Sequence, residues 1–227
     1  MTGDNATPSD QTLRDVASLL LSVIADDGFV LAGAGAIREH SLTQRRTADV
    51  DLFGPPLTTP QQFAIVVERV EHALLSAGYT VERARSFAQF ARLGVAMHDR
   101  QVLEVDLALN WRADPPVQMA VGPVLSERDA VAGKLSAVYS RGEVRDFLDL
   151  DAIRSSGRWP DETLLALARE HDEGFDDRML AAQLARVGSL LPSEAATYGI
   201  SDDDFAAVQS RLLDWASTII EPPTPVP

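Results

Sequence analysis

The segment over residues 29–53 constrains the fold of this chain most strongly. Apolar residues 29–32 indicate a short buried strand that runs directly into a glycine turn at 33–35. A second strand follows around residue 50, and because side chains alternate along a strand, Asp49 and Asp51 point to the same face of it. The segment therefore predicts a sheet that presents two carboxylates on one face, downstream of a glycine turn.

The rest of the chain predicts a mixed α/β part followed by a helical part. The first part has a helical pattern that ends near Gly28, a short helix over about 36–42, a helix opened by Thr59 and Pro60, and strands within 79–109 that include a hairpin. Further helices are expected at about 126–139, 143–155, 161–171, 177–187 and 202–219. We expect disorder at 1–10, an α/β domain over 11–120, a helical domain over 121–220 and a disordered tail at 221–227.

Composition narrows the class of protein. The chain has 227 residues, 45% of them apolar, which is enough for a hydrophobic core, and it has no cysteine for disulfides or thiolate metal sites. It has neither a spanning apolar run nor a signal-peptide pattern, so we expect a cytoplasmic protein with no membrane partner. The formal charge of -14 argues against a general affinity for phosphate backbones. Four arginines that fall close together could still form a local basic face or lie as solvated residues: Arg83, Arg85, Arg92 and Arg100.

The alternating aspartates are candidate metal ligands. Like charges on one face repel each other unless a cation neutralises them, and carboxylate oxygens suit Mg²⁺. A later strand carries Glu104 and Asp106 with the same alternation, and if it lies beside the first strand, Asp106 can join Asp49 and Asp51. Three carboxylates that hold two cations can clamp the attacking and leaving oxygens of a phosphoryl transfer. The alternative is that both acid pairs face solvent.

Two further features predict phosphate contacts. The turn at 33–35 exposes backbone N–H groups at the start of a helix, where a phosphate can bind. A dinucleotide-binding fingerprint is disfavoured because Arg38 occupies its third glycine position and the following acids come as a same-face pair. Of the 20 basic residues only Lys134 is a lysine, which either survives by chance or serves where a compact ammonium is needed.

Two segments carry a resemblance to a known family: FVLAGAGAIREHSLTQRRTADVDLF at 29–53 and DAVAGKLSAVYSRGEVRDFLDL at 129–150. Their order and contexts resemble the polymerase-β-type nucleotidyltransferase superfamily and, within it, the AbiEii-type (MenT-like) toxins of type IV toxin–antitoxin systems. The resemblance implies an α+β fold, in which a polymerase-β-like nucleotidyltransferase mixed sheet with flanking helices is followed by a helical C-terminal domain.

The resemblance also implies roles for individual residues. The expected catalytic residues are Asp49, Asp51, Lys134 and Asp146, and the expected metal ligands are Asp49, Asp51 and Asp106. The expected nucleotide-binding residues are Gly33, Ala34, Gly35, Arg46, Thr47 and Lys134. Three of these depart from the family pattern: Ala34 replaces its second glycine, Gly35 stands at its threonine, and Thr47 replaces a serine. Asp146 has an alternative role, which is to pair with Arg141 or Arg145 along its helix.

The function implied by the resemblance is Mg²⁺-dependent transfer of a nucleoside monophosphate from an NTP to RNA, notably the 3′ end of tRNA, by a toxin that a cognate antitoxin restrains. Its site would straddle both domains, with metals on the first and Lys134 on the second. The acidic composition leaves open a protein acceptor (AMPylation) or a small molecule such as an aminoglycoside. A third alternative is a catalytically silent binding module, which the joint presence of Asp49, Asp51 and Lys134 disfavours.

Overall fold

The computed structural model describes residues 9–97 and 100–220, except for the side chains of residues 100–102. The predicted tail at 221–227, most of the predicted disordered segment 1–10 and the turn at 98–99 lie outside the described residues. The described residues divide into two compact units: unit 1 comprises 9–40, 46–97 and 100–130, and unit 2 comprises 41–45 and 131–220. The domain boundary expected at 120/121 precedes this division by a short stretch of chain.

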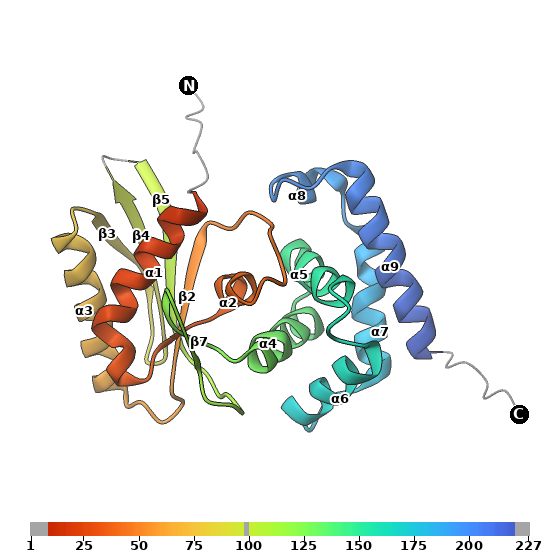
Figure 1. Ribbon diagram of the computed structural model, residues 1–227, viewed down its shortest axis with the longest axis horizontal. Helices are drawn as coiled ribbons and strands as arrows, with labels where there is room; N and C mark the ends of the chain where they lie inside the picture. The colour runs from red at the N-terminus through yellow and green to blue at the C-terminus, as the bar shows by residue number, and fades with distance from the viewer. Residues whose placement is uncertain (1–8, 98–99, 221–227) are drawn as a thin grey trace, which may run out of the picture. The chain divides into compact units, whose positions relative to one another are not determined.

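Unit 1 is built on a mixed sheet whose described strands follow the order β3-β4-β5-β2-β1-β7-β6 (Figure 1). The strands are β1 (Val30–Leu31), β2 (Asp49–Gly54), β3 (Thr80–Ser86), β4 (Phe90–Met97), β5 (Arg100–Leu109), β6 (Val117–Met119) and β7 (Gly122–Val124). β2 pairs in parallel with β5, and β4 lies antiparallel to β5, so the hairpin expected from the sequence is present.

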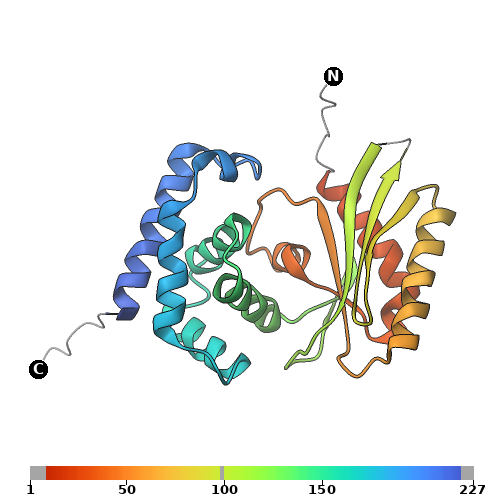
Figure 2. The same cartoon turned by 180° about the vertical axis from the view of Figure 1, so that it is seen from behind.

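Helices cover both faces of this sheet. They are α1 (Asp10–Ile24), followed by a short 3₁₀ turn, α2 (Gly33–Glu39) and α3 (Pro60–Ser76). Figures 1 and 2 show α1 and α3 on one face of the sheet and α2 on the other. Leu52, Phe63 and Leu93 are fully buried or nearly so, and they belong to the core under α1 and α3. α3 begins where the sequence predicts, because Thr59 and Gln62 form a capping box ahead of it.

Unit 2 is helical. Its elements are the greater part of α4 (Glu127–Ser140), which starts in unit 1, then α5 (Val144–Ser155), α6 (Asp161–His171), α7 (Asp177–Ala185), a 3₁₀ turn at Arg186–Ser189, α8 (Pro192–Ala196) and α9 (Asp202–Ile220). α9 packs on α5, α7 and α8 through an apolar stripe that includes Phe205 and Leu212. Arg211 of α9 donates two hydrogen bonds to Asp151 of α5, at 2.8 and 2.7 Å. No helix among the described residues is long and apolar enough to cross a membrane.

The observed elements differ from the predicted ones in two respects. α2 starts at Gly33 and not near residue 36, because Gly33 adopts φ +54° and lets the chain enter the helix directly from β1. β6, β7 and α8 were not predicted from the sequence. Each has only three to five residues, which is too short for a periodic pattern to stand out.

Candidate active site

The strand register brings the predicted carboxylates together on one face of the sheet. Asp51 lies opposite Asp106, and Asp49 lies opposite Glu104, across the parallel β2–β5 pair. Neighbouring strands are about 4.8 Å apart, so each pair of acids is in close cross-strand proximity. The condition placed on Asp106, that its strand lies beside that of Asp49 and Asp51, is therefore confirmed.

An arginine that the sequence analysis did not assign to the site neutralises part of this face. Arg92 of β4 lies opposite Asp106 and donates from Nε and Nη2 to its two carboxylate oxygens at 2.7 and 2.6 Å. Its Nη1 lies 3.2 Å from Glu104 Oε2. The hydrogen bonds to Asp106, together with the charges of Asp106, Glu104 and Asp49, raise the pKa of Arg92 above its ordinary value.

The face of the sheet that carries Asp49, Asp51, Glu104 and Asp106 is called the acid face below. Its carboxylate oxygens lie on two adjacent strands and are of the kind that binds a divalent cation. In the described part of the chain, no three acidic or histidine side chains converge as a ready metal site. Two contacts engage oxygens of the predicted ligands: Thr47 donates its hydroxyl hydrogen to Asp49 Oδ1, and Arg92 donates to both oxygens of Asp106. Oxygen ligands on adjacent strands suit Mg²⁺. Asp49, Asp51 and Asp106 would therefore fit the ion, provided that Asp106 releases Arg92 when the ion binds.

The glycine turn lies directly against Asp51. A Cβ atom built on Gly33 would fall 1.7 Å from Asp51 Oδ2, and the N–H of Ala32 donates to the Asp51 carbonyl at 2.8 Å. The first N–H groups of a helix have no acceptor within the helix, so those at the start of α2 can serve a phosphate. Gly33 is therefore required both for its positive φ and for the space that the Asp51 carboxylate occupies.

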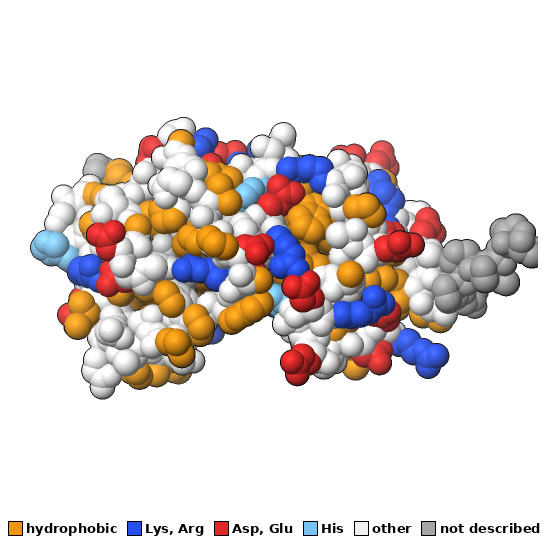
Figure 3. All heavy atoms as spheres, turned by 60° about the horizontal axis from the view of Figure 1, so that its bottom comes forward, with side chains coloured by type: hydrophobic (Ala, Val, Ile, Leu, Met, Phe, Trp, Pro, Cys, Tyr) orange, Lys and Arg blue, Asp and Glu red, His pale blue; other side chains and the backbone are white. Residues whose placement is uncertain are grey.

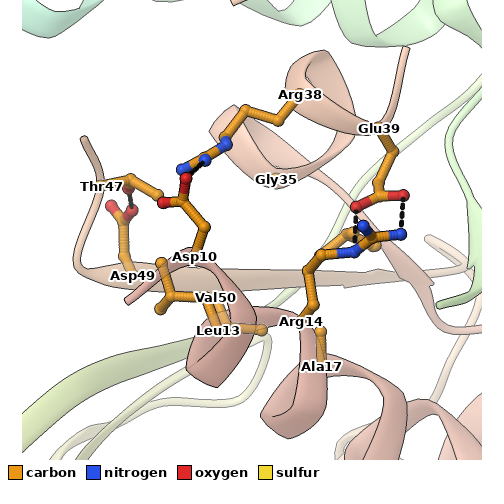
Figure 4. Close-up of a pocket in the computed structure, with 11 residues that line it drawn as sticks. Asp10, Leu13, Arg14, Ala17, Gly35, Arg38, Glu39, Thr47, Asp49 and Val50 are labelled. Atoms are coloured by element: carbon orange, nitrogen blue, oxygen red, sulfur yellow. Dashed lines mark hydrogen bonds and ion pairs between the residues drawn. The ribbon is translucent and has the colours of Figure 1, made fainter. Parts of the chain in front are cut away.

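A small cavity lies beside Asp49 between α1, α2 and β2 (Figure 4). Ion pairs between Asp10 and Arg38 and between Arg14 and Glu39 connect α1 to α2 at its edge, as the dashed lines in Figure 4 show. Its volume is about 40 Å³, which holds only a few water molecules. A nucleotide needs a much larger site, so this cavity is not the nucleotide pocket.

In unit 2, Lys134 belongs to a buried ionic group. Its Nζ lies 2.7 Å from Asp149 Oδ2, and Arg45 donates from Nε and Nη2 to the same carboxylate at 2.7 and 2.8 Å. Burial disfavours the charged form of Asp149, but the charges of Lys134 and Arg45 outweigh it and hold the pKa of Asp149 below its ordinary value. Two cations therefore share the buried carboxylate of Asp149.

Asp146 lies in a different environment from the one expected of a catalytic acid. It is fully buried and accepts two hydrogen bonds from Arg141 at 2.8 Å each. It also accepts a hydrogen bond from the N–H of Glu143 at 3.2 Å, which caps α5. Asp146 is thus placed as in the alternative reading, which paired it with Arg141, and its catalytic role stays a prediction. Asp149, three positions later on α5, is the acid that contacts Lys134.

The sequence analysis assigned no role in the site to Arg45 or Asp149, and it considered Arg92 only as part of a local basic face or as a solvated residue. Asp149 could have been noticed, because it is the second acid of the motif segment 145–150 and follows Asp146 by nearly one helical turn. Arg92 could have been noticed only as a basic residue on a strand. Arg45 carries no sequence signal, since its partner Asp149 is 104 positions away along the chain.

The comparisons with known proteins identify the family of this chain. The family model described as "Nucleotidyl transferase AbiEii toxin, Type IV TA system" matches residues 16–218. No curated protein matches the sequence significantly.

Two solved structures share the fold. JHP933 from Helicobacter pylori matches at 18% identity and a TM-score of 0.56 over 94% of this chain and 93% of that one. MenT4, a nucleotidyltransferase toxin from Mycobacterium tuberculosis H37Rv, matches at 18% identity and a TM-score of 0.54 over 94% of this chain and 84% of that one. Identities this low show a common fold, while the family model spans nearly the whole chain. The chain therefore belongs to the AbiEii family of nucleotidyltransferase toxins of type IV toxin–antitoxin systems.

Proposed function

We propose that this protein transfers a nucleoside monophosphate from an NTP to the 3′-terminal hydroxyl of an RNA, notably a tRNA, with Mg²⁺ as cofactor. The observation that carries the proposal is the parallel register of β2 and β5, which places Asp51 opposite Asp106 beside the glycine turn. The toxin role and the restraining antitoxin follow from the family. The acceptor and the metal are our proposals.

The reaction joins the acceptor to the α-phosphorus of the NTP. The hydroxyl oxygen forms a bond to that phosphorus, the P–O bond to the β-phosphate breaks, and pyrophosphate leaves. Asp49, Asp51 and Asp106 would hold Mg²⁺, which when bound would offset the charge of the triphosphate and of the attacking oxygen. One of these aspartates would also accept the hydroxyl proton; we assign this role to Asp106, which lies opposite Asp51 on the neighbouring strand.

The glycine turn supplies the phosphate contacts in this proposal. The N–H groups at the start of α2 would donate to triphosphate oxygens, with Gly33 holding the turn against Asp51. Arg46 is exposed and Thr47 is buried against Asp49, and both stay proposed nucleotide-binding residues. The triphosphate contact of Lys134 also stays a prediction. In the structure its ammonium contacts Asp149, whose carboxylate it shares with Arg45.

The acceptor can be identified by incubating the protein with each α-labelled NTP, Mg²⁺ and total RNA. We expect the label on RNA, and on tRNA in particular, with no incorporation when EDTA removes the metal. Label on protein would replace the RNA proposal with AMPylation. No transfer with any NTP or acceptor would indicate a silent binding module.

Replacing Gly33 with alanine should reduce nucleotide transfer by about 100-fold or more, because the new methyl group displaces the Asp51 carboxylate. The matched control is Gly78→Ala, since Gly78 also has a positive φ, +88°, but nothing lies within 4 Å of its added Cβ. Backbone strain should cost each variant about 1–2 kcal/mol of stability, and Gly33→Ala should lose more than Gly78→Ala because of the overlap with Asp51. Initial rates and thermal melts distinguish them. Equal activity of the two variants would contradict the role of Gly33.

A further inference from the structure

A row of charged side chains crosses the sheet of unit 1. In the strand register, Asp51 lies opposite Asp106, Asp106 opposite Arg92, and Arg92 opposite Arg85 of β3. Residues directly opposite each other on neighbouring strands point to the same face, so these four side chains share the acid face. The row therefore changes from negative at the catalytic strands to positive at the edge strand β3.

The two ends of the row differ in their surroundings. At the Asp51 end lies the glycine turn, where a Cβ on Gly33 would overlap the carboxylate. At the other end, Arg85 is exposed on β3, the edge strand of the sheet. Among the residues that the structure describes, the Arg85 guanidinium has no hydrogen bond or ion pair. A site with the proposed phosphate-binding N–H groups at one end and an available guanidinium at the other would receive two different substrates.

Arg85 lies opposite Arg92 and, unlike Arg92, has no carboxylate partner among the described residues. Two like charges directly opposite each other on a sheet destabilise the pair unless an anion lies between or above them. The guanidinium of Arg92 contacts Asp106 and Glu104, so the N–H donors of Arg85 are the ones available to a bound anion. Phe87, which follows β3 directly, is 67% exposed and adds an aromatic ring near this end.

Arg83, on the same strand, is partnered differently. Its Nε and Nη2 donate to the two carboxylate oxygens of Glu71 on α3, at 2.7 and 2.6 Å. It lies opposite Leu93, which belongs to the buried face. β3 therefore directs one arginine to a helix and the other to the open acid face.

The overall charge of the chain and the face drawn in Figure 3 offer little that would attract a polyanion. The net charge of the chain is -14, and on the face drawn in Figure 3 basic side chains are scattered among acidic and apolar ones. A phosphate backbone would thus be held by a few placed arginines and not by a broad basic area. Arg85 meets that requirement because a guanidinium can bind phosphate through two parallel hydrogen bonds.

We propose that Arg85 binds the phosphodiester backbone of a single-stranded RNA 3′ end, and that the acceptor enters over β3 and β4 while the NTP occupies the glycine-turn side. Arg92 lies opposite both Asp106 and Arg85 and is therefore on the path between them. The exposed ring of Phe87 suits base stacking, which is tolerant of sequence. This inference rests on the proposed RNA-directed activity.

The test compares Arg85→Gln with the matched control Arg83→Gln. With labelled NTP and varied RNA, Arg85→Gln should raise the KM for RNA by about tenfold, leave the Kd of NTP unchanged, and reduce the slope of log KM against log salt by about 0.7, as loss of one phosphate contact predicts. Arg83→Gln should leave all three quantities unchanged. An unchanged KM in Arg85→Gln, or an equal weakening of NTP binding, would overturn the proposal.

A binding measurement separates this proposal from the proposed activity. Fluorescence anisotropy of a short single-stranded RNA, recorded without NTP, reports RNA affinity whether or not transfer occurs. We expect Arg85→Gln to bind about tenfold more weakly than the wild type and Arg83→Gln to bind equally well. Equal affinity of all three proteins would refute the role of Arg85 even if RNA is the acceptor. Absence of transfer with weakened Arg85→Gln binding would refute only the activity.

Discussion

An Asp51→Asn variant should transfer nucleotide about 1000-fold more slowly than the wild-type protein while keeping its fold. The substitution preserves the shape of the side chain and removes the negative charge that would bind the metal beside the glycine turn. A rate loss of this size corresponds to about 4 kcal/mol of transition-state stabilisation, which is in the range that a metal contributes by polarising a phosphoryl oxygen. Folding should tolerate the change, because the acid face loses one of several mutually repelling charges.

The matched control for Asp51→Asn is Glu104→Gln. Glu104 lies on the same face, opposite Asp49, but its side chain is 41% exposed and forms an ion pair with Arg92. We expect Glu104→Gln to change the initial rate by less than about tenfold, since it removes a charge near the site without removing a proposed ligand. Initial rates at saturating NTP, with circular dichroism to check the fold, measure both variants. An Asp51→Asn variant that keeps a tenth of the wild-type rate would contradict the assignment of the site.

Replacing Asp149 with asparagine should lower the free energy of unfolding by about 3–5 kcal/mol, the usual loss when one partner of a buried ion pair is removed. Lys134 and Arg45 would then remain buried as two cations without their shared carboxylate. For a chain of 227 residues, this corresponds to a fall in Tm of about 10 °C. Calorimetry or urea unfolding gives the value. Asp177→Asn is the control, because the Arg169–Asp177 pair is exposed and should contribute less than about 1 kcal/mol.

The pH dependence of this difference has a definite sign. The pKa of Asp149 in the folded protein is lowered, so its ionised form stabilises the fold. That contribution is fully present above the pKa of an unfolded aspartate, about 3.9, and is lost as the pH falls through the lower pKa of the folded state. The gap in stability between wild type and Asp149→Asn should therefore be constant from about pH 7 to pH 5 and shrink below about pH 4. A gap that closes near neutral pH would show that the carboxylate charge is not its source.

The fold and the acid face could be predicted because both depend on local patterns. Alternation along β2 and β5 places Asp49, Asp51 and Asp106 on one face whatever the rest of the chain does, and only the adjacency of the two strands was conditional. The start of α2 was missed by a few residues because a positive φ at Gly33 is not a periodic feature. The resemblance supplied the order of the motifs, and the family model agrees with it.

The partners of the site side chains could not be predicted, because they depend on register and on distant segments. Arg92 meets Asp106 only because β4 and β5 pair in one register from Phe90 to Val95, and that register shifts between Val95 and Ala96. Arg45 meets Asp149 across 104 positions, and no local pattern encodes that contact. The same limitation applies to Asp146, whose burial against Arg141 is a result of packing around α5.

The position of the transferred label tests the nucleotidyl transfer most directly. The protein is incubated with total RNA and Mg²⁺, in one reaction with α-labelled NTP and in a parallel one with γ-labelled NTP. Transfer of a nucleoside monophosphate predicts that the α-label appears on the acceptor, that the γ-label appears only in pyrophosphate, and that the two products form in equal amounts. γ-Label on the acceptor, or incorporation of α-label without matching pyrophosphate, would contradict the reaction assigned to this site.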